Sequence, residues 1–302
     1  MIDVCVLLST YNGGRYLDDQ MSSIFSQVFE GTIKVLVRDD GSVDDTRAIL
    51  KKWAKDFSVT VIEGNNVGPM ASFFNLVGQA PHCDFYAFCD QDDVWEPHKI
   101  DSGVKRLLTL PSDQPSLYFS NAFLVDEQLS NDNDLYHSTD PNFTLVGSMV
   151  CNPALGCTMV SNRSLMDIVR ITNPSHTPMH DKFFLLTALL LGNVVYDKAP
   201  QIKYRQHSMN VYGREGSIKK RIKQTLRLWF GSRQSTLDKQ AHELLNLYRN
   251  RISDLHKAEL MLFAEYKKSL AKKVSLLTSP NAVTTHSRAN RSFMIRVLLN
   301  LA

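Results

Sequence analysis

The fold is decided by one stretch, Asp84-Phe85-Tyr86-Ala87-Phe88-Cys89-Asp90-Gln91-Asp92-Asp93. The run over residues 84–89 has the length and aromatic content of a buried strand. Three carboxylates follow in four residues at the carboxyl end of this strand, where they repel one another. Oxygen ligands at this spacing suit Mg²⁺ or Mn²⁺. The alternative is an acidic turn in which Asp92 or Asp93 caps a helix that begins at Glu96-Pro97.

Strand and helix patterns alternate through the first hundred residues. This order predicts an α/β fold, a mostly parallel sheet flanked by helices on both faces. Residues 110–213 give weaker patterns of the same two kinds. The predicted strands are Val4–Ser9, Ile33–Val37, Val59–Ile62, 84–89, Leu117–Ser120, Thr158–Val160 and Val194–Tyr196, and the predicted helices are Tyr16–Phe29, Asp44–Phe57, Met70–Val77, Ser164–Ile171 and Asp181–Leu191.

Three polar loops follow strands of this predicted sheet. They are Ser9–Gly13, Asp39–Ser42 and the acidic cluster at Asp90. Ligands of parallel sheets bind outside the carboxyl ends of the strands, which is the edge where these loops meet. The sequence therefore predicts one crevice lined by all three loops. Taken singly, Asn12 and Asp40 are also ordinary turn residues.

The net charge of +3 hides an uneven distribution. Residues 1–213 hold 16 Lys and Arg against 25 Asp and Glu, a net charge of −9. Residues 214–302 hold 18 Lys and Arg against 6 Asp and Glu, a net charge of +12. With the glycines at 213 and 216, this reversal predicts two parts, an acidic α/β domain over residues 1–213 and a basic helical region over residues 214–302. Opposite charges on the two parts imply two different partners.

The cysteines and the N-terminus bear on the compartment. Five cysteines without a Cys-x-x-Cys pair predict reduced thiols in a cytosolic protein. No apolar run approaches the length of a membrane-spanning helix, and a strand pattern at Val4 lies where a signal peptide would begin.

Several segments, in their order and spacing, resemble family 2 glycosyltransferases of the GT-A fold. The resemblance covers about residues 3–213 and points to the rhamnosyltransferase-like branch that builds bacterial O-antigens, capsules and cell-wall glycans. It rests on residues 6–13, 38–46 and the acidic cluster, and on the later segments Gly156–Met159, His180–Phe184 and Tyr204–Val211.

The resemblance implies roles on the donor side. Thr10, Tyr11 and Asn12 would line a nucleotide pocket. Asp40 would accept a hydrogen bond from the pyrimidine N–H of the donor. Asp90 would face both the ribose and a divalent cation, Mn²⁺ or Mg²⁺.

The same resemblance implies a metal centre. Asp92 would ligate the cation that bridges the two phosphates of the donor, and His207 would complete its coordination shell. Arg205 would lie beside the pyrophosphate. Such a cation neutralises the charge that develops on a nucleoside diphosphate leaving group. Asp93 fits helix capping as well as it fits metal binding.

On the acceptor side, Asp181 would act as the general base. An inverting transfer needs one carboxylate to take the proton of the attacking hydroxyl. An Asp in the first turn of a helix also stabilises that helix. His180 would lie beside the base, and Trp95 would either form a wall of the acceptor site or pack in the core. Lys182 stands where the family usually has an aromatic residue, which leaves the acceptor surface undefined.

The activity implied by the resemblance is inverting, metal-dependent sugar transfer. The expected donor is dTDP-rhamnose, with a UDP-hexose as the close alternative, and the expected acceptor is a polyprenyl-diphosphate-linked glycan. A nucleotide-sugar-binding protein without turnover is the alternative outside enzymes. The acidic body argues against a nucleic-acid partner.

The basic region contains a candidate amphipathic helix. Apolar residues recur at helical spacing over residues 218–229, among five Lys and Arg side chains. This pattern predicts a helix on an anionic membrane surface, which would place the protein on the inner face of the cell membrane. An oligomerisation helix, a solvated helical face and a nucleic-acid-binding patch are the alternatives. The segment from Phe293 to Leu299 is predicted to be either a second surface helix or disordered.

Overall fold

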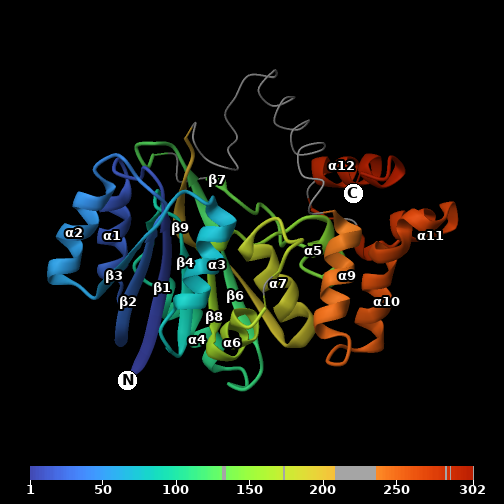
Figure 1. Ribbon diagram of the computed structural model, residues 1–302, viewed down its shortest axis with the longest axis horizontal. Coiled ribbons are helices and arrows are strands. Elements are labelled where there is room, and N and C mark those ends of the chain that lie inside the picture. The colour runs from blue at the N-terminus through green and yellow to red at the C-terminus, as the bar shows by residue number, and fades with distance from the viewer. Residues whose placement is uncertain (131–133, 173, 208–235, 283, 286, 302) are drawn as a thin grey trace.

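The computed structural model describes residues 1–130, 134–172, 174–207, 236–282, 284–285 and 287–301. Figure 1 shows a twisted sheet with helices on both faces and the C-terminal helices gathered at one end. The strands are β1 (Ile2–Thr10), β2 (Gly31–Asp39), β3 (Val59–Glu63), β4 (Phe85–Cys89), β5 (Val94–Trp95), β6 (Ser116–Val125), β7 (Asp134–Leu135), β8 (Met159–Asn162) and β9 (Asn193–Arg205).

Within the described residues these nine strands form one sheet, ordered β3-β2-β1-β4-β8-β6-β9-β5, with β7 paired to β6. Strands β1 to β4 pair in parallel, as predicted. Strand β8 is antiparallel to both of its neighbours, β4 and β6. It starts opposite Phe119 of β6 and runs back between the two strands. The sheet is therefore mixed beyond β4, whereas the sequence predicted a mostly parallel one.

Side chains of β1 alternate between two hydrophobic clusters. Val4, Val6 and Leu8 pack on one face of the sheet, and Cys5 and Leu7 pack on the other. This two-residue period is the one expected of a strand buried on both faces. The helices are α1 (Leu17–Phe25), α2 (Thr46–Asp56), α3 (Pro69–Gln79), α4 (Lys99–Leu108), α5 (Leu145–Val150), α6 (Arg163–Arg170), α7 (His180–Leu191), α9 (Leu237–Tyr248), α10 (Asp254–Glu265), α11 (Leu270–Leu277) and α12 (Ser287–Leu298).

The two clusters assign the helices to the two faces. Helices α1, α2 and α4 cover the first face. Helices α3, α5, α6 and α7 cover the second, and α9 to α12 extend the same cluster outward. The C-terminal helices are thereby packed against the α/β body through α5 and α7.

The residues after the acidic cluster form a strand and not the start of a helix. Val94 and Trp95 pair with Lys203 and Ile202 of β9, and α4 begins only at Lys99. The prediction that Asp92 or Asp93 caps a helix at Glu96-Pro97 is therefore wrong. Long-range pairing with β9 extends the backbone at the point where local capping would need it to coil.

Two predictions fall on residues that the structure does not describe. The proposed boundary near residue 213 and the basic helix over residues 218–229 both lie within residues 208–235. The division at residue 213 stays a prediction. Among the described helices, none has the length and apolar content needed to cross a bilayer.

Candidate active site

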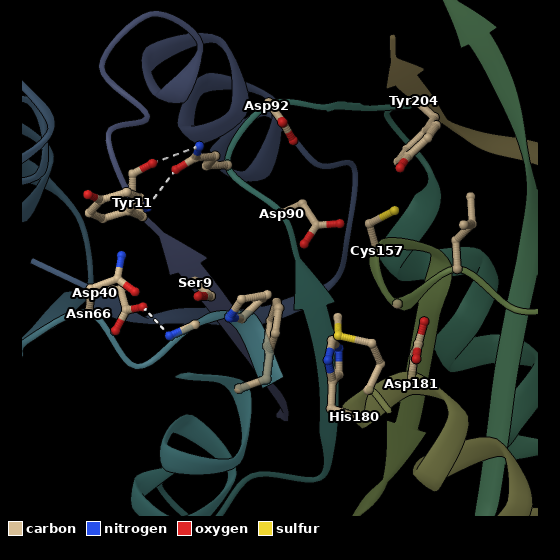
Figure 2. Close-up of a pocket in the computed structure, with 17 residues that line it drawn as sticks. Ser9, Tyr11, Asp40, Asn66, Asp90, Asp92, Cys157, His180, Asp181 and Tyr204 are labelled. Carbon is tan, nitrogen blue, oxygen red and sulfur yellow. Dashed lines mark hydrogen bonds between the residues drawn. The ribbon is translucent and has the colours of Figure 1, made fainter. Parts of the chain in front are cut away.

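A cavity of about 290 Å³ lies at the carboxyl ends of β1 and β4, and all three predicted loops contribute to it. Figure 2 shows Tyr11 and Asp40 on one side, Asp181 on the other and Asp90 between them. The lining residues are Ser9, Tyr11, Asp40, Asn66, Gly68, Pro69, Phe73, Asp90, Gln91, Asp92, Leu155, Gly156, Cys157, Met179, His180, Asp181 and Tyr204.

The cavity is strongly acidic. Its wall holds four carboxylates, those of Asp40, Asp90, Asp92 and Asp181, and none of its described lining residues is Lys or Arg. Burial, together with the charges of Asp92 and Asp181, raises the pKa of Asp90 to about 7. A bound cation would favour the ionised form of Asp90.

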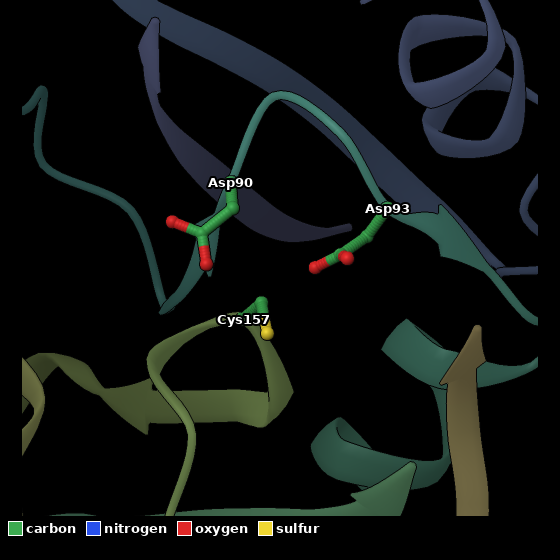
Figure 3. A group of neighbouring side chains, drawn as sticks. All are labelled: Asp90, Asp93 and Cys157. Carbon is green, nitrogen blue, oxygen red and sulfur yellow. The ribbon is translucent and has the colours of Figure 1, made fainter. Parts of the chain in front are cut away.

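A second acidic side chain lies behind Asp90. The fully buried Asp93 accepts a hydrogen bond from the Arg205 N–H (3.1 Å), but its Oδ2 has no hydrogen-bond partner among the described residues. One ligand atom each from Asp90, Asp93 and Cys157 lie within 4.8 Å of one another (Figure 3). Burial and the neighbouring carboxylates raise the pKa of Asp93 well above its usual value. A cation bound nearby would stabilise a buried carboxylate oxygen that has no hydrogen-bond partner.

The remaining predicted metal ligands form a pair. His207 Nε2 lies 2.7 Å from Asp92 Oδ2, and its ring stacks on Tyr16 with 5.1 Å between the ring centroids. Asp92 lines the cavity, while His207 lies behind it. The predicted trio is thus arranged as Asp90 in the cavity wall and a contacting Asp92–His207 pair.

Arg205 supports the acidic loop from behind. Its buried guanidinium donates to the Asp92 carbonyl (2.8 Å) and to the carboxylate of Asp19 (3.1 Å), and it stacks over the Tyr16 ring. It is not among the cavity-lining residues. In this structure Arg205 holds the loop that carries Asp92, and its place beside the donor pyrophosphate stays a prediction.

Gln91 joins the acidic loop to the loop after β1. Its Oε1 accepts hydrogen bonds from Thr10 Oγ1 (2.7 Å) and the Tyr11 N–H (2.8 Å), and its Nε2 donates to the Tyr11 carbonyl (3.2 Å). Thr10 is consequently buried in this contact and does not line the cavity, although the sequence predicted that it would. Tyr11 does line it.

Asn12 joins the loop after β1 to the loop after β2. Its backbone N–H donates to Ser42 Oγ and its Oδ1 accepts from the Val43 N–H, both at 2.9 Å. The residue has a φ of 49°, a left-handed conformation that Asn adopts more readily than most residues. Asn12 is outside the cavity lining, and its contact with a nucleotide stays a prediction.

The two aspartates at the end of β2, Asp39 and Asp40, have different roles. Asp39 accepts from the Ser42 N–H (3.0 Å) and so closes the turn. Asp40 lines the cavity, pairs with the Arg38 guanidinium and accepts from the Gly68 N–H (2.9 Å). The turn-forming role that the sequence allowed for Asp40 belongs to Asp39. Asp40 holds the rim formed by residues 64–68.

Asp181 and His180 lie at the opposite wall, at the first turn of α7. Asp181 accepts from the Lys182 N–H (2.6 Å), and burial raises the pKa of its carboxyl to about 6. His180 stacks on Phe73 with ring centroids 3.8 Å apart, and burial lowers its pKa to about 3. Neither ring nitrogen of His180 has a hydrogen-bond partner among the described residues. The first turn of α7 therefore places the Asp181 carboxylate beside a buried, neutral imidazole.

Comparison with known proteins identifies the family. Residues 5–148, which hold β1 to β4 and the acidic cluster, match the model of glycosyl transferase family 2. The dTDP-rhamnosyl transferase RfbG of Shigella flexneri is 26% identical over 238 residues, 72% of this chain and 77% of the relative. Residues 5–148 of this chain are a glycosyl transferase family 2 domain. The predicted family is confirmed.

Two further similarities define the extent of this relationship. An uncharacterized glycosyltransferase of Nostoc is 33% identical over 100 residues, which are 32% of this chain and only 30% of that relative. The crystal structure of S. aureus TarS 1-349 in complex with UDP-GlcNAc has a TM-score of 0.63 at 17% identity, over 99% of this chain and 80% of that one. This second similarity shows the GT-A fold of the glycosyltransferase.

The structure places the two side chains whose roles the sequence left open. In this glycosyltransferase Lys182 is buried and its Nζ donates to the Met149 carbonyl of α5 (2.7 Å), so it does not line the cavity. Trp95 is 3% exposed and packs in the core, with the Lys99 ammonium 3.9 Å from its ring centroid. The prediction that Trp95 forms an acceptor wall is therefore corrected to the core alternative.

Several residues of the site escaped the sequence analysis. Gln91 stood inside the acidic cluster, but its partners Thr10 and Tyr11 are about eighty residues away. Cys157 belonged to a recognised family segment without a role. Phe73 and Met179 carried no chemical signal, because apolar residues in a helix and a loop are read as packing.

Proposed function

We propose that this glycosyltransferase transfers a sugar, with inversion, from a nucleotide-sugar donor in a reaction that depends on Mn²⁺ or Mg²⁺. The observation that carries the proposal is the charge of the cavity, four carboxylates with no Lys or Arg among the described lining residues. A donor diphosphate would be repelled by such a wall unless a divalent cation lay between them.

The residues present fit such a cation. Asp90 and Asp92 offer carboxylate oxygens from the cavity wall, and His207 offers Nε2 beside Asp92. The unsatisfied Oδ2 of the buried Asp93 lies behind them. Carboxylate and imidazole ligands together suit Mn²⁺, and carboxylates alone suit Mg²⁺. The bound cation would neutralise charge on the departing diphosphate.

The two walls of the cavity have different proposed roles, one in binding the donor and one in activating the acceptor. Tyr11 and Asp40 contact the nucleoside. Asp181 takes the proton of the acceptor hydroxyl as that oxygen attacks the anomeric carbon, because its buried carboxylate has a pKa of about 6 and is ionised at neutral pH. His180 positions this base from within the wall, where its ring stacks on Phe73.

The proposed donor is dTDP-rhamnose. The wall near Asp181 is apolar, formed by Phe73, Leu155 and Met179, and it suits the methyl group that rhamnose carries in place of a hydroxymethyl group. Similarity to RfbG supports the same donor. A UDP-hexose is the second candidate, because the structurally similar TarS was crystallised with UDP-GlcNAc.

The proposed acceptor is a polyprenyl-diphosphate-linked bacterial glycan. This assignment rests on the resemblance to enzymes that build surface polysaccharides. It places the protein in the cytoplasm, at the inner face of the cell membrane. A homodimer formed through the basic region is the second proposal for residues 214–302.

Thermal unfolding with nucleotide sugars tests donor and metal together. A donor at a hundred times its Kd stabilises a folded protein by about 2.7 kcal/mol, which raises Tm by roughly 5–10 °C in a protein of this size. We expect this shift with dTDP-rhamnose plus Mn²⁺ and a much smaller shift when either is omitted. If no nucleotide sugar shifts Tm in the presence of Mn²⁺, the proposal is wrong.

Two variants separate an enzyme from a protein that only binds nucleotide sugars. Asp92→Asn should weaken binding of Mn²⁺ alone, followed by electron paramagnetic resonance, and abolish the donor-dependent shift. Asp181→Asn should keep that shift and lose transfer. Asp167→Asn, on the partly exposed face of α6, is the matched control and should change neither. Donor binding by the wild type without any transfer would favour the non-catalytic alternative.

A further inference from the structure

The last two helices present an apolar surface to solvent. Leu270 and Val274 lie one turn apart on α11 and are 73% and 49% exposed. On α12, Phe293 and Val297 face the core, while Met294, Ile295 and Leu298 are 50%, 41% and 54% exposed. Leu299 continues this exposed set. We name these six exposed residues the C-terminal patch.

The two helices adjoin, so their exposed side chains belong to neighbouring parts of one surface. Lys273 Nζ of α11 donates to the Leu298 carbonyl at the end of α12 (3.2 Å). Figure 1 shows α11 and α12 next to each other at the end of the molecule far from β1 to β3. Exposed apolar side chains gathered on two adjoining helices mark an interaction site more often than scattered exposed leucines do.

The charge around the patch identifies the partner. Residues 266–302 contain seven Lys and Arg and no Asp or Glu. Lys268 and Lys272 share one carboxylate, that of Glu265, so pairing within the chain does not neutralise the surface. A second copy that docked through the same patch would bring the same cations to the interface and be repelled. An anionic lipid surface would accept both the leucines and the cations.

We infer that the C-terminal patch on α11 and α12 docks this protein onto the surface of an anionic bilayer. The apolar side chains enter the boundary between headgroups and acyl chains, and the lysines contact lipid phosphates. The biological purpose of this contact rests on the proposed function, since a lipid-linked acceptor would require the transferase to work at a bilayer. The contact itself needs neither donor nor metal.

Vesicle flotation of the full-length protein tests the inference. The probes are vesicles of phosphatidylglycerol and phosphatidylcholine in equal parts, with pure phosphatidylcholine for comparison, and no nucleotide sugar is present. The wild type should float with the anionic vesicles at low salt and release at high salt. Leu270→Gln/Leu298→Gln should weaken binding about tenfold or more, because two leucines lose their transfer into lipid. Lys272→Gln should weaken it about fivefold.

The matched control is Leu255→Gln. Leu255 is 67% exposed at the start of α10, the end of that helix remote from α11. Its substitution should leave vesicle binding unchanged. Leu298→Trp keeps the patch apolar, and its added fluorescence should be quenched by brominated lipids, so the inference does not depend on a variant that loses binding.

Three results would overturn the inference. One is a wild type that does not bind anionic vesicles. Another is a Leu270→Gln/Leu298→Gln variant that binds like the wild type, which would assign binding to residues outside the patch. The third is a stable dimer in solution that this variant dissociates. Since the assay contains no donor, loss of sugar transfer with intact vesicle binding would contradict only the proposed function.

Discussion

The pH dependence of transfer gives the sharpest test of the proposed base. Asp181 must be ionised to take a proton from the acceptor hydroxyl. Burial raises the pKa of Asp181 to about 6, from the usual value of 3.8. The reaction rate should therefore rise with pH through about 6, and not through about 4 as it would for an exposed aspartate.

The size of the effect follows from the fraction of Asp181 that is ionised. With a pKa of about 6, about 97% of the carboxyl is ionised at pH 7.5 but only about 9% at pH 5. The rate at pH 5 should accordingly be about a tenth of the rate at pH 7.5. An aspartate at its usual pKa would lose only about 6% over the same range.

The assay is the release of nucleoside diphosphate at saturating donor, acceptor and Mn²⁺, measured from pH 5 to pH 8. Saturating Mn²⁺ keeps Asp90 ionised, so the profile reports on Asp181. Asp181→Asn should reduce kcat by about 10²- to 10⁴-fold and remove the limb near pH 6. Asp167→Asn should keep both. A wild-type rate that is equal at pH 5 and pH 7.5, or a limb that persists in Asp181→Asn, would refute the assignment.

Two further predictions concern side chains that the structure moved out of the cavity. Arg205→Met should lower the free energy of unfolding by about 2–4 kcal/mol in urea denaturation, because it leaves the Asp92 carbonyl without its donor. The control Arg163→Met, on the surface, should lower it by less than about 1 kcal/mol. Equal effects of the two substitutions would contradict the supporting role of Arg205. Lys182→Met should leave the acceptor KM within about twofold of the wild type, since the lysine binds α5 and not the acceptor. A tenfold rise in KM without a change in Tm would return Lys182 to the acceptor site.

Local patterns were sufficient to predict the first half of the fold. Continuous apolar runs predicted β1, β2, β3 and β4, and apolar residues at helical spacing predicted the helices between them. The helix ends were less well predicted. The helix predicted to run to Phe29 stops at Phe25, because the Gln27 side chain and the Val28 N–H bind the carbonyls of Glu96 and Pro97. Those partners are distant in sequence and leave no local signal.

The sequence by itself determined that three polar loops meet at one edge of a sheet and that one of them is acidic. These properties follow from the apolar patterns of the strands and helices and from the order of these elements along the chain. Both can be read from short stretches of sequence. Only the tertiary structure decided the direction of β8 and the burial of Asp93 and Trp95. It also decided the hydrogen bond from Lys182 to α5 and the hydrogen bond between Gln91 and Tyr11. Each of these depends on a partner far along the chain, and whether such a side chain meets substrate, core or another loop is fixed only when the elements pack.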